Sequence, residues 1–308
     1  MNLLKSTLAT VIGASLLMPA MAANIEIYGK ANLSVQSSDE GEGSFTEIKS
    51  NASRVGFKGT HDLGDGLEVI YQAEFQVDMD GDSAKGDSIT DRNQFIGLKG
   101  SFGEVLLGIN DTILKQSQGK IDLFSDLNGD IKVLWKGENR KSDTLTYKSP
   151  KFNGFQFGAT YIAEDSVDAE DGYSVGVFYG DAKLKKSDVF ASIAMDNDVK
   201  GYDITRASVQ GKLAGFTLGA MIQTQEKSTG GSDMDGYMVS AKYGIDKVTL
   251  KAQYQLADHD GGDDKSGFTV GADYKLAKNT KLYTFYTTFD MDSEADEDYL
   301  AVGVEYKF

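Results

Sequence analysis

Acidic and basic side chains are interspersed along residues 111–140, where one long stretch interrupts a regular series of short alternating segments. Asp122, Asp126 and Asp130 are spaced by four residues, so they would share one face if this part is helical. An acidic strip that faces basic side chains would orient dipolar solutes and filter ions through its local field. Loops of this length within a domain are usually functional. The alternative is that these aspartates only solvate a loop.

The same stretch separates charge without accumulating it, because its acidic and basic side chains are balanced. The acids are Asp111, Asp122, Asp126, Asp130 and Glu138, and the bases are Lys115, Lys120, Lys132, Lys136 and Arg140. We interpret the stretch as a loop folded inward to constrict a pore, with its charges turned toward the opposite wall.

Catalysis is the alternative chemistry, and only His61 and His259 offer an imidazole for it. His259 stands between Asp258 and Asp260, where a carboxylate could orient a general base. A histidine in an acidic loop is more simply a surface residue. We therefore predict that the chain is not an enzyme. A barrel hydrolase stays open as the alternative, which loss of hydrolysis in His259→Ala would support.

Neither a metal nor another cofactor is expected. The chain has no cysteine, so it offers no disulfide and no thiolate ligand. The run that begins at Asp78 starts like a calcium-binding loop, but Ser83 takes the place of the required glycine and Ile89 that of the bidentate acid. The formal net charge of −16 argues against a nucleic-acid partner, which would require a basic surface.

The first 22 residues have the pattern of a secretory signal peptide. Lys5 is followed by an apolar run over residues 7–17, and Ala20 to Ala22 form a small-residue cleavage site. The sequence therefore predicts a signal peptide over 1–22 and one domain over 23–308. No later run approaches the roughly 18 apolar residues of a spanning helix, so insertion into a membrane would have to use strands.

Most of the remaining chain alternates between apolar and polar residues with a period of two. The pattern is clear over residues 25–36, 67–77, 248–256 and 300–308, and it predicts strands with two different faces. Pro150 is the one proline after the signal segment, which suits a chain that is mostly continuous sheet. The fold class is therefore predicted to be all-β.

Short and long connections alternate along the chain. The short ones are expected near residues 63–66, 101–103, 152–154, 180–181, 214–215, 244–246 and 278–279, and the long ones near 38–48, 79–91, 111–140, 164–171, 196–202, 226–235, 258–266 and 290–298. Seven short and eight long connections predict sixteen antiparallel strands. Short turns on one rim and long loops on the other are typical of outer-membrane β-barrels, in which the long loops lie outside.

The apolar faces of the strands favour a lipid environment. Lysine and arginine are almost absent from these faces in mid-strand, where each would cost roughly 2–4 kcal/mol. Aromatic residues such as Tyr28, Tyr161 and Tyr243 stand near strand ends, as in interfacial girdles. The opposite faces carry small and polar residues, which predicts an open aqueous lumen rather than a plugged one. Tyr283 and Phe285 are ambiguous, and could face the lumen.

Several motifs are similar to those of the general diffusion porins of Gram-negative bacteria. They are Ser53-Arg54-Val55-Gly56-Phe57-Lys58-Gly59, Asp91-Arg92-Asn93, Phe102-Gly103-Glu104, Gly119-Lys120-Ile121-Asp122, Glu138-Asn139-Arg140, residues 147–154 and the terminal Tyr306-Lys307-Phe308. The chain resembles this family over its whole length after the signal segment. One departure is Ile109, where the family pattern has a basic residue, and it argues against strong anion selectivity.

The resemblance implies a trimeric sixteen-stranded barrel in the outer membrane that lets small hydrophilic solutes and ions diffuse passively. It implies that the third long loop faces a basic wall, which here would include Arg54 and Arg92, with Lys30 and Lys58 as further candidates. An ion pair of either arginine with Glu68 or Glu74 is the structural alternative. A solute-specific channel is the closest functional rival.

The constriction is accordingly predicted to combine the two wall arginines with charged residues of the stretch 111–140. These residues are Arg54, Arg92, Asp111, Lys120, Asp122, Asp126, Asp130 and Arg140. Phe308 is implied to be the signal for membrane insertion by the outer-membrane assembly machinery. The expected partners are outer-membrane lipid, lipopolysaccharide, this machinery, two further copies of the chain, and small solutes and ions.

Overall fold

The computed structural model describes residues 24–81, 86–164, 166, 170–231, 233–262, 264–292 and 294–308. The predicted signal peptide over 1–22 lies outside these residues. The strands are β1 (Asn24–Asp39), β2 (Ser44–Ser50), β3 (Arg54–Gly64), β4 (Leu67–Val77), β5 (Ile89–Gly100), β6 (Gly103–Asp111), β7 (Arg140–Lys148), β8 (Phe155–Ile162), β9 (Gly172–Gly180), β10 (Val189–Asn197), β11 (Tyr202–Leu213), β12 (Phe216–Lys227), β13 (Met234–Ile245), β14 (Val248–His259), β15 (Lys265–Ala277), β16 (Thr280–Asp290) and β17 (Glu297–Lys307).

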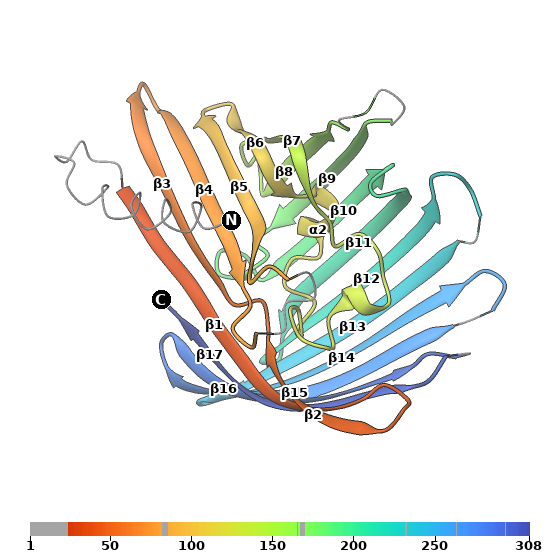
Figure 1. Cartoon of the computed structure of the whole chain (residues 1–308). Coiled ribbons are helices and arrows are strands. Elements are labelled where there is room, and N and C mark those ends of the chain that lie inside the picture. The colour runs from red at the N-terminus through yellow and green to blue at the C-terminus, as the bar shows by residue number, and fades with distance from the viewer. Residues whose placement is uncertain are drawn as a thin grey trace.

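These strands form one closed antiparallel sheet, shown in Figure 1. Closure is made by β1 and β17, which pair from Lys30 opposite Lys307 to Asp39 opposite Asp298. On its other edge β1 pairs with β2 along its second half and with β3 along its first half. Because β2 and β3 occupy one place in the wall, the barrel is sixteen-stranded, as predicted.

The alternation in sequence becomes an alternation between the two faces of the wall. On β1 the Val35 side chain is 55% exposed on the outside, whereas the next residue, Gln36, is fully buried on the inside. A closed sheet leaves no edge, so every strand finds partners for its backbone groups, as a bilayer requires. No helix among the described residues is long and apolar enough to cross a membrane.

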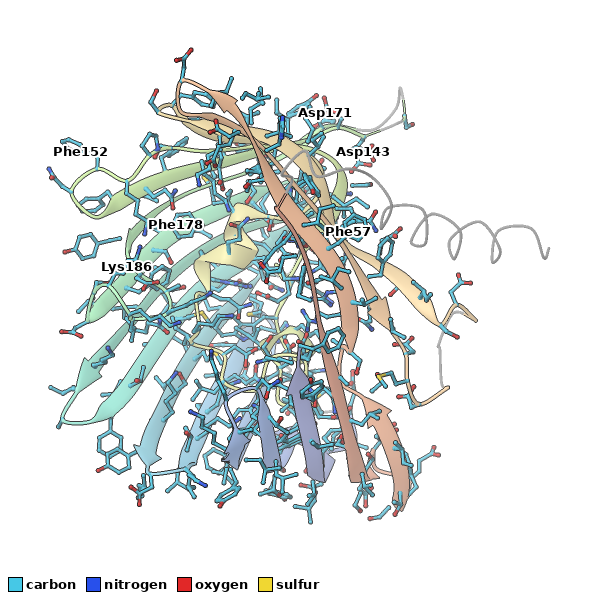
Figure 2. The ribbon with its side chains drawn as sticks, turned by 90° about the vertical axis from the view of Figure 1, so that its left-hand side faces the viewer. Phe57, Asp143, Phe152, Asp171, Phe178 and Lys186 are labelled. Carbon is cyan, nitrogen blue, oxygen red and sulfur yellow. The ribbon has the colours of Figure 1, made fainter. Side chains whose placement is uncertain are left out.

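Short and long connections alternate less regularly than predicted. The β7–β8 connection on the short-turn rim spans six residues, 149–154, and the β10–β11 connection on the other rim spans only four, 198–201. Residues 180–181 were predicted to form a tight turn, and this is wrong, because the connection between β9 and β10 spans residues 181–188. Its backbone is organised by Asp181, whose carboxylate accepts hydrogen bonds from the amides of Lys183, Lys185 and Lys186. Figure 2 shows Phe152 and Lys186 on one side of the molecule and Asp143 and Asp171 on the other.

Candidate pore constriction

Residues 112–139, which we call the inward loop, connect β6 to β7 and lie within the barrel (Figure 1). The helices of the loop are α2 (Ile113–Ser117) and η2 (Ile131–Val133). Thr112 begins α2, since its side chain accepts a hydrogen bond from the Lys115 amide. Turns and bends occupy most of residues 118–130, so the predicted helical strip of Asp122, Asp126 and Asp130 is wrong.

Apolar packing holds one side of the inward loop against the wall. Ile121, Phe124 and Trp135 are buried in a cluster to which β12, β13, β14, β16 and β17 also contribute side chains. Those contributed by the strands are Met221, Met234, Met238, Ala257, Tyr283, Phe285, Phe289, Tyr299 and Ala301. The aromatic pair left ambiguous by the sequence therefore faces inward, beneath the loop. Burying each large apolar side chain contributes about 1.5–3 kcal/mol.

Glycines on the inner wall make room for the side chains of the loop. A Cβ at Gly236 would lie 2.6 Å from Cε2 of Trp135, and one at Gly219 would lie 2.8 Å from Cγ2 of Ile121. Such contacts are too close for any residue larger than glycine without displacement of the loop. Some of the small lumen residues thus seat the loop, in addition to leaving space for water.

Backbone groups of the loop are bonded to the same wall. Gln253 on β14 accepts a hydrogen bond from the Leu123 amide at 2.8 Å and donates to the Gly129 carbonyl at 2.9 Å. The Trp135 indole donates to the Leu256 carbonyl at 3.0 Å. With these bonds in place, the loop is fixed at both its centre and its C-terminal part.

Asp122 and Asp130 belong to the internal structure of the loop. Asp122 accepts hydrogen bonds from the amides of Phe124 and Ile131 at 2.9 and 3.1 Å. Burial and the nearby Asp130 raise the pKa of Asp122 to about 8. Asp130 accepts from the amides of Asp126 and Lys132 at 2.8 and 2.9 Å. Asp122 is therefore turned away from the pore, contrary to the prediction.

Asp126 is the loop carboxylate that reaches the opposite wall. Its side chain forms ion pairs with Arg54 on β3 and, at 2.9 Å, with Lys30 on β1. Burial opposes ionisation of Asp126, but Lys30 and Arg54 outweigh it and hold its pKa well below the usual range. The third member of the expected aspartate strip thus does face basic residues.

The wall arginines are held by Glu74, one of the two acids predicted to pair with them. Arg92 Nε lies 2.6 Å from Glu74 Oε1, and Arg54 Nη1 lies 3.8 Å from the same atom. Glu68 instead pairs with Lys99, at 3.8 Å. Carboxylates that hold arginines in place fix the direction in which the guanidinium groups point.

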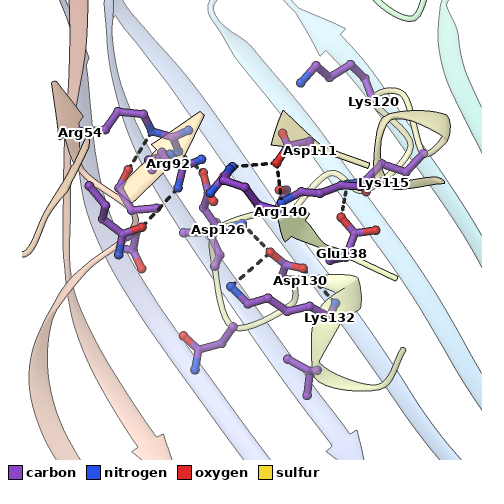
Figure 3. A pocket seen from close by; sticks show the side chains of 18 of the residues that line it. Arg54, Arg92, Asp111, Lys115, Lys120, Asp126, Asp130, Lys132, Glu138 and Arg140 are labelled. Atoms are coloured by element: carbon purple, nitrogen blue, oxygen red, sulfur yellow. Dashed lines mark hydrogen bonds and ion pairs between the residues drawn. The ribbon is translucent and has the colours of Figure 1, made fainter. Parts of the chain in front are cut away.

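Besides the ion pairs around Asp126 and Glu74, a second group of ion pairs joins the two ends of the inward loop. Asp111 Oδ1 lies 2.9 Å from Arg140 Nη2 and 3.2 Å from Lys115 Nζ, and Arg140 also donates a hydrogen bond to Asn93. Figure 3 shows members of both groups, with Arg54, Arg92 and Asp126 from the first and Asp111, Lys115 and Arg140 from the second. Lys120 has no interaction with the other residues shown there.

The two groups line one cavity of about 790 Å³. Seven of the eight predicted constriction residues border it: Arg54, Arg92, Asp111, Lys120, Asp126, Asp130 and Arg140. Asp122 does not. Of the further candidates, Lys30 acts through Asp126, whereas Lys58 pairs with Glu26. Among the described residues, no group of three or more His, Cys, Asp or Glu side chains could hold a metal ion.

A water-filled barrel with an inward loop between charged groups is the architecture of a channel, and the family comparison agrees. The model of the family described as Gram-negative porin matches residues 7–308. The chain belongs to this family. It is a porin of the Gram-negative outer membrane, through which small hydrophilic solutes diffuse passively. The family is one of channels, so the hydrolase alternative around His259 is not needed.

Individual relatives span nearly the whole porin. A monosaccharide porin of a Halomonas species is 28% identical over 372 residues, which cover 99% of this chain and 100% of the relative. The major outer membrane protein P.IB of Neisseria meningitidis serogroup B, strain H44/76, is 26% identical over 344 residues, with the same coverage of 99% and 100%.

Solved structures share the fold at low sequence identity. The anion-selective porin from Comamonas acidovorans superposes with a TM-score of 0.76 at 19% identity, over 93% of this porin and 100% of that chain. The trimer form of OmpT from Vibrio cholerae superposes with a TM-score of 0.68 at 17% identity, over 93% and 100% of the two chains.

Sequence reasoning missed Arg206 on β11, which anchors the N- and C-terminal parts of the inward loop. Arg206 is fully buried, and its Nη1 lies 2.7 Å from Glu138 Oε1. Its Nε donates to Gln223 at 2.8 Å, and its two Nη groups reach the carbonyls of Leu114 and Lys136. Burial raises the pKa of Glu138, while Arg206 opposes that rise. The inward parity of Arg206 on its strand was the available signal.

Phe308 lies beside the first strand of the porin. Its amide donates to the Gly29 carbonyl at 3.1 Å, and its carbonyl accepts from the Gly29 amide at 3.0 Å. A Cβ at Gly29 would lie 2.3 Å from the Phe308 ring, so glycine is needed at this contact. Phe308 thus takes part in closing the barrel.

Proposed function

We propose that permeation through this porin is controlled in the cavity bordered by Asp126 on the inward loop and by Arg54 and Arg92 on the wall. The carrying observation is the cavity that these side chains line together with Asp111, Lys120, Asp130 and Arg140. Separated charges across a narrow aqueous passage orient dipolar solutes and select ions by local field. Asp122 is left out of this proposal, because it is buried within the loop.

Conductance and solute uptake test the position of the constriction. Purified porin in planar bilayers should give stable conductance steps, and in liposomes it should admit small neutral sugars. Replacement of both wall arginines, Arg54→Ser with Arg92→Ser, should widen the passage and speed swelling with larger sugars. Lys99→Ser is the matched control, because Lys99 pairs with Glu68 and does not line the cavity.

Two results would contradict this assignment. Folded porin that leaves the bilayer silent would refute an open pore. Equal swelling rates in the double variant and in wild type would place the constriction elsewhere.

A solute-specific channel for sugars is the second candidate, and the name of the Halomonas relative suggests it. Aromatic rings exposed along a lumen would be expected to bind sugar faces. Here Tyr283 and Phe285 are 4% and 2% exposed, since they pack under the inward loop. This packing favours general diffusion, and saturable uptake of a single sugar would reverse that preference.

We further propose that the porin is a homotrimer in contact with lipid and lipopolysaccharide. The shared fold with the trimer form of OmpT supports this assembly. Mass measurement in detergent should give three copies, and single insertions should conduct in groups of three steps. A monomeric mass with full conductance would contradict the trimer.

Export and insertion complete the proposal. The signal peptide over 1–22 should be absent from porin extracted from the outer membrane, so N-terminal sequencing should begin at Ala23. Phe308 is proposed to be recognised by the assembly machinery, and Phe308→Ala should lower the amount of folded porin in the membrane. A normal amount in that variant would remove this role.

A further inference from the structure

The unexpectedly long connection over residues 181–188 packs against the inner surface of the barrel. Gln210 on β11 donates a hydrogen bond to the Ala182 carbonyl, and Lys212 donates to the Leu184 carbonyl. Leu184 is buried, and Ala182 lines the same cavity as the charged residues of the constriction. The rim that carries the short turns therefore also contributes a segment to the narrow part of the pore.

This segment brings Lys183 toward Lys120 of the inward loop. Two effects lower the pKa of Lys120. Partial removal from bulk water is the larger, and repulsion by the Lys183 ammonium is the second. The Lys120 side chain is nevertheless exposed to the lumen. Lys242, at an inward position of β13, is within electrostatic reach of Lys120 as well. The geometry agrees: Lys120 and Ala182, which precedes Lys183, both line the cavity. A Cβ at Gly219 would lie 2.8 Å from both Ile121 Cγ2 and Ser240 Oγ, so the residue after Lys120 lies beside Ser240, two residues before Lys242 on β13.

None of these three lysines has an ion-pair partner among the described residues. The carboxylate that attracts Lys120 most is Asp126, which is already bonded to Lys30 and Arg54. Elsewhere along the pore wall most basic side chains do have a carboxylate, as Arg92 has Glu74 and Arg140 has Asp111. Uncompensated charge is therefore concentrated at Lys120, Lys183 and Lys242.

The strand next to Lys242 adds positive charge rather than removing it. Lys242 stands directly opposite Lys251 on β14, and like charges in such a pair destabilise a sheet. Lys251 and Lys281 share one carboxylate, that of Asp273, each at 2.9 Å. The wall beside the three lysines thus has more ammonium groups than carboxylates, and an anion would relieve their repulsion.

We propose that Lys120, Lys183 and Lys242 form a binding subsite for small dianions, such as sulfate-like oxyanions, on the inner side of the constriction. The proposal rests on the proposed function, because the subsite lies on the permeation path. Several ammonium groups around one doubly charged ion favour it over chloride, since each Coulomb interaction doubles. A bound dianion would occupy the passage and slow the flow of monovalent ions.

Chloride current in the presence of sulfate tests the subsite. Porin in a planar bilayer in potassium chloride should lose conductance as potassium sulfate is added at constant ionic strength, with a saturating dependence on sulfate. In the variant Lys120→Gln with Lys183→Gln and Lys242→Gln, half-inhibition should need at least about tenfold more sulfate. A tenfold change corresponds to about 1.4 kcal/mol of binding free energy.

Lys186→Gln is the matched control, because Lys186 lies on the same connection but is four residues from Ala182, which lines the cavity, whereas Lys183 is next to it. It should leave the half-inhibiting sulfate concentration unchanged. No inhibition of wild type by sulfate would overturn the subsite, and so would an equal shift in Lys186→Gln. Conductance in potassium chloride alone shows that each variant is folded. If wild type conducts in potassium chloride but is not inhibited by sulfate, the subsite is refuted while the proposed pore function stands.

Discussion

The side of the inward loop that packs on β9 to β17 is largely apolar and buried, whereas the side that faces β1 and β3 to β5 is charged and borders the cavity. On the first side Trp135 and Phe124 are buried, and Arg206 is enclosed with its single carboxylate partner. On the second, Asp126 forms ion pairs with Arg54 and Lys30, and both Asp126 and Arg54 line the cavity. The difference separates two tasks. One wall holds the loop, and the other forms the filter with it.

The largest effect is expected where the loop is held by charge. Arg206→Met removes the partner of Glu138 and should cost roughly 3–5 kcal/mol of stability, because breaking a buried pair leaves one uncompensated charge. Chemical unfolding in detergent measures this cost. The double variant Arg206→Met with Glu138→Gln should recover most of it. Equal losses in the single and double variants would show that the pair does not anchor the loop.

A smaller loss of stability is expected where the loop is held by close packing against glycines of the wall. Gly236→Ala places a methyl group against the Trp135 ring and should cost about 1–3 kcal/mol, as overpacking does. It should also increase current noise, since the loop is displaced. Gly244→Ala on the same strand is the control, because a Cβ there meets nothing within 4 Å. Identical current noise and stability in both variants would argue against a role of Gly236 in making room for Trp135.

The pH dependence of stability should report on Asp122, inside the loop. Its pKa of about 8 in the folded porin lies above the ordinary 3.8, so the folded state binds the proton more tightly than the unfolded state does. The contribution of Asp122 to stability should therefore be greatest below about pH 4 and should fall as pH rises toward 8, by at most about 1.4 kcal/mol per pH unit.

Asp122→Asn should flatten that part of the profile in equilibrium unfolding measured from pH 4 to 9. An unchanged slope in this variant would assign the effect to another group.

Substitution of Asp126 is expected to have the smallest effect in free energy and the clearest effect on ion selectivity. Asp126→Asn removes one negative charge from the filter, which changes the energy of a monovalent ion about 6 Å away in water by roughly 0.7 kcal/mol. Chloride gains and potassium loses about threefold each, so the chloride-to-potassium permeability ratio should rise about tenfold. Reversal potentials under a salt gradient measure the ratio. At neutral pH Asp122→Asn should leave it unchanged. A larger shift in Asp122→Asn than in Asp126→Asn would reverse the roles assigned to the two aspartates.

The fold could be predicted because each strand shows its two faces in a local period of two residues. The same parity placed Arg54 and Arg92 inward and offered Glu68 or Glu74 as their partner, of which the structure shows Glu74. The spacing of Asp122, Asp126 and Asp130 led to a wrong prediction of one shared face, because residues four apart share a face only in a helix. The backbone here is not helical, since Asp126 is left-handed with φ of 70°. Which wall a loop packs against depends on contacts between distant residues, so Arg206 escaped notice.

The connection over 181–188 escaped for a different reason. A glycine followed by an aspartate is a common turn signal, and Gly180 indeed has a positive φ of 83°. Yet Asp181 begins a longer segment, whose amides it caps with its own side chain. A local turn signal marks where a strand ends and carries no information on how long the following segment is.

The interruption between β2 and β3 gives the barrel a point of mechanical compliance. A closed ring of paired strands resists bending because backbone hydrogen bonds join each strand to its neighbours. At residues 51–53 side-chain hydrogen bonds replace part of this backbone pairing. One example is the Asn32 amide, which donates to Ser53 Oγ. The strand β1 spans the gap and keeps the ring closed. Arg54 follows directly, with its Nε bonded to the Ala52 carbonyl at 3.0 Å. Bending of the wall at this gap would therefore move the guanidinium group that faces the pore.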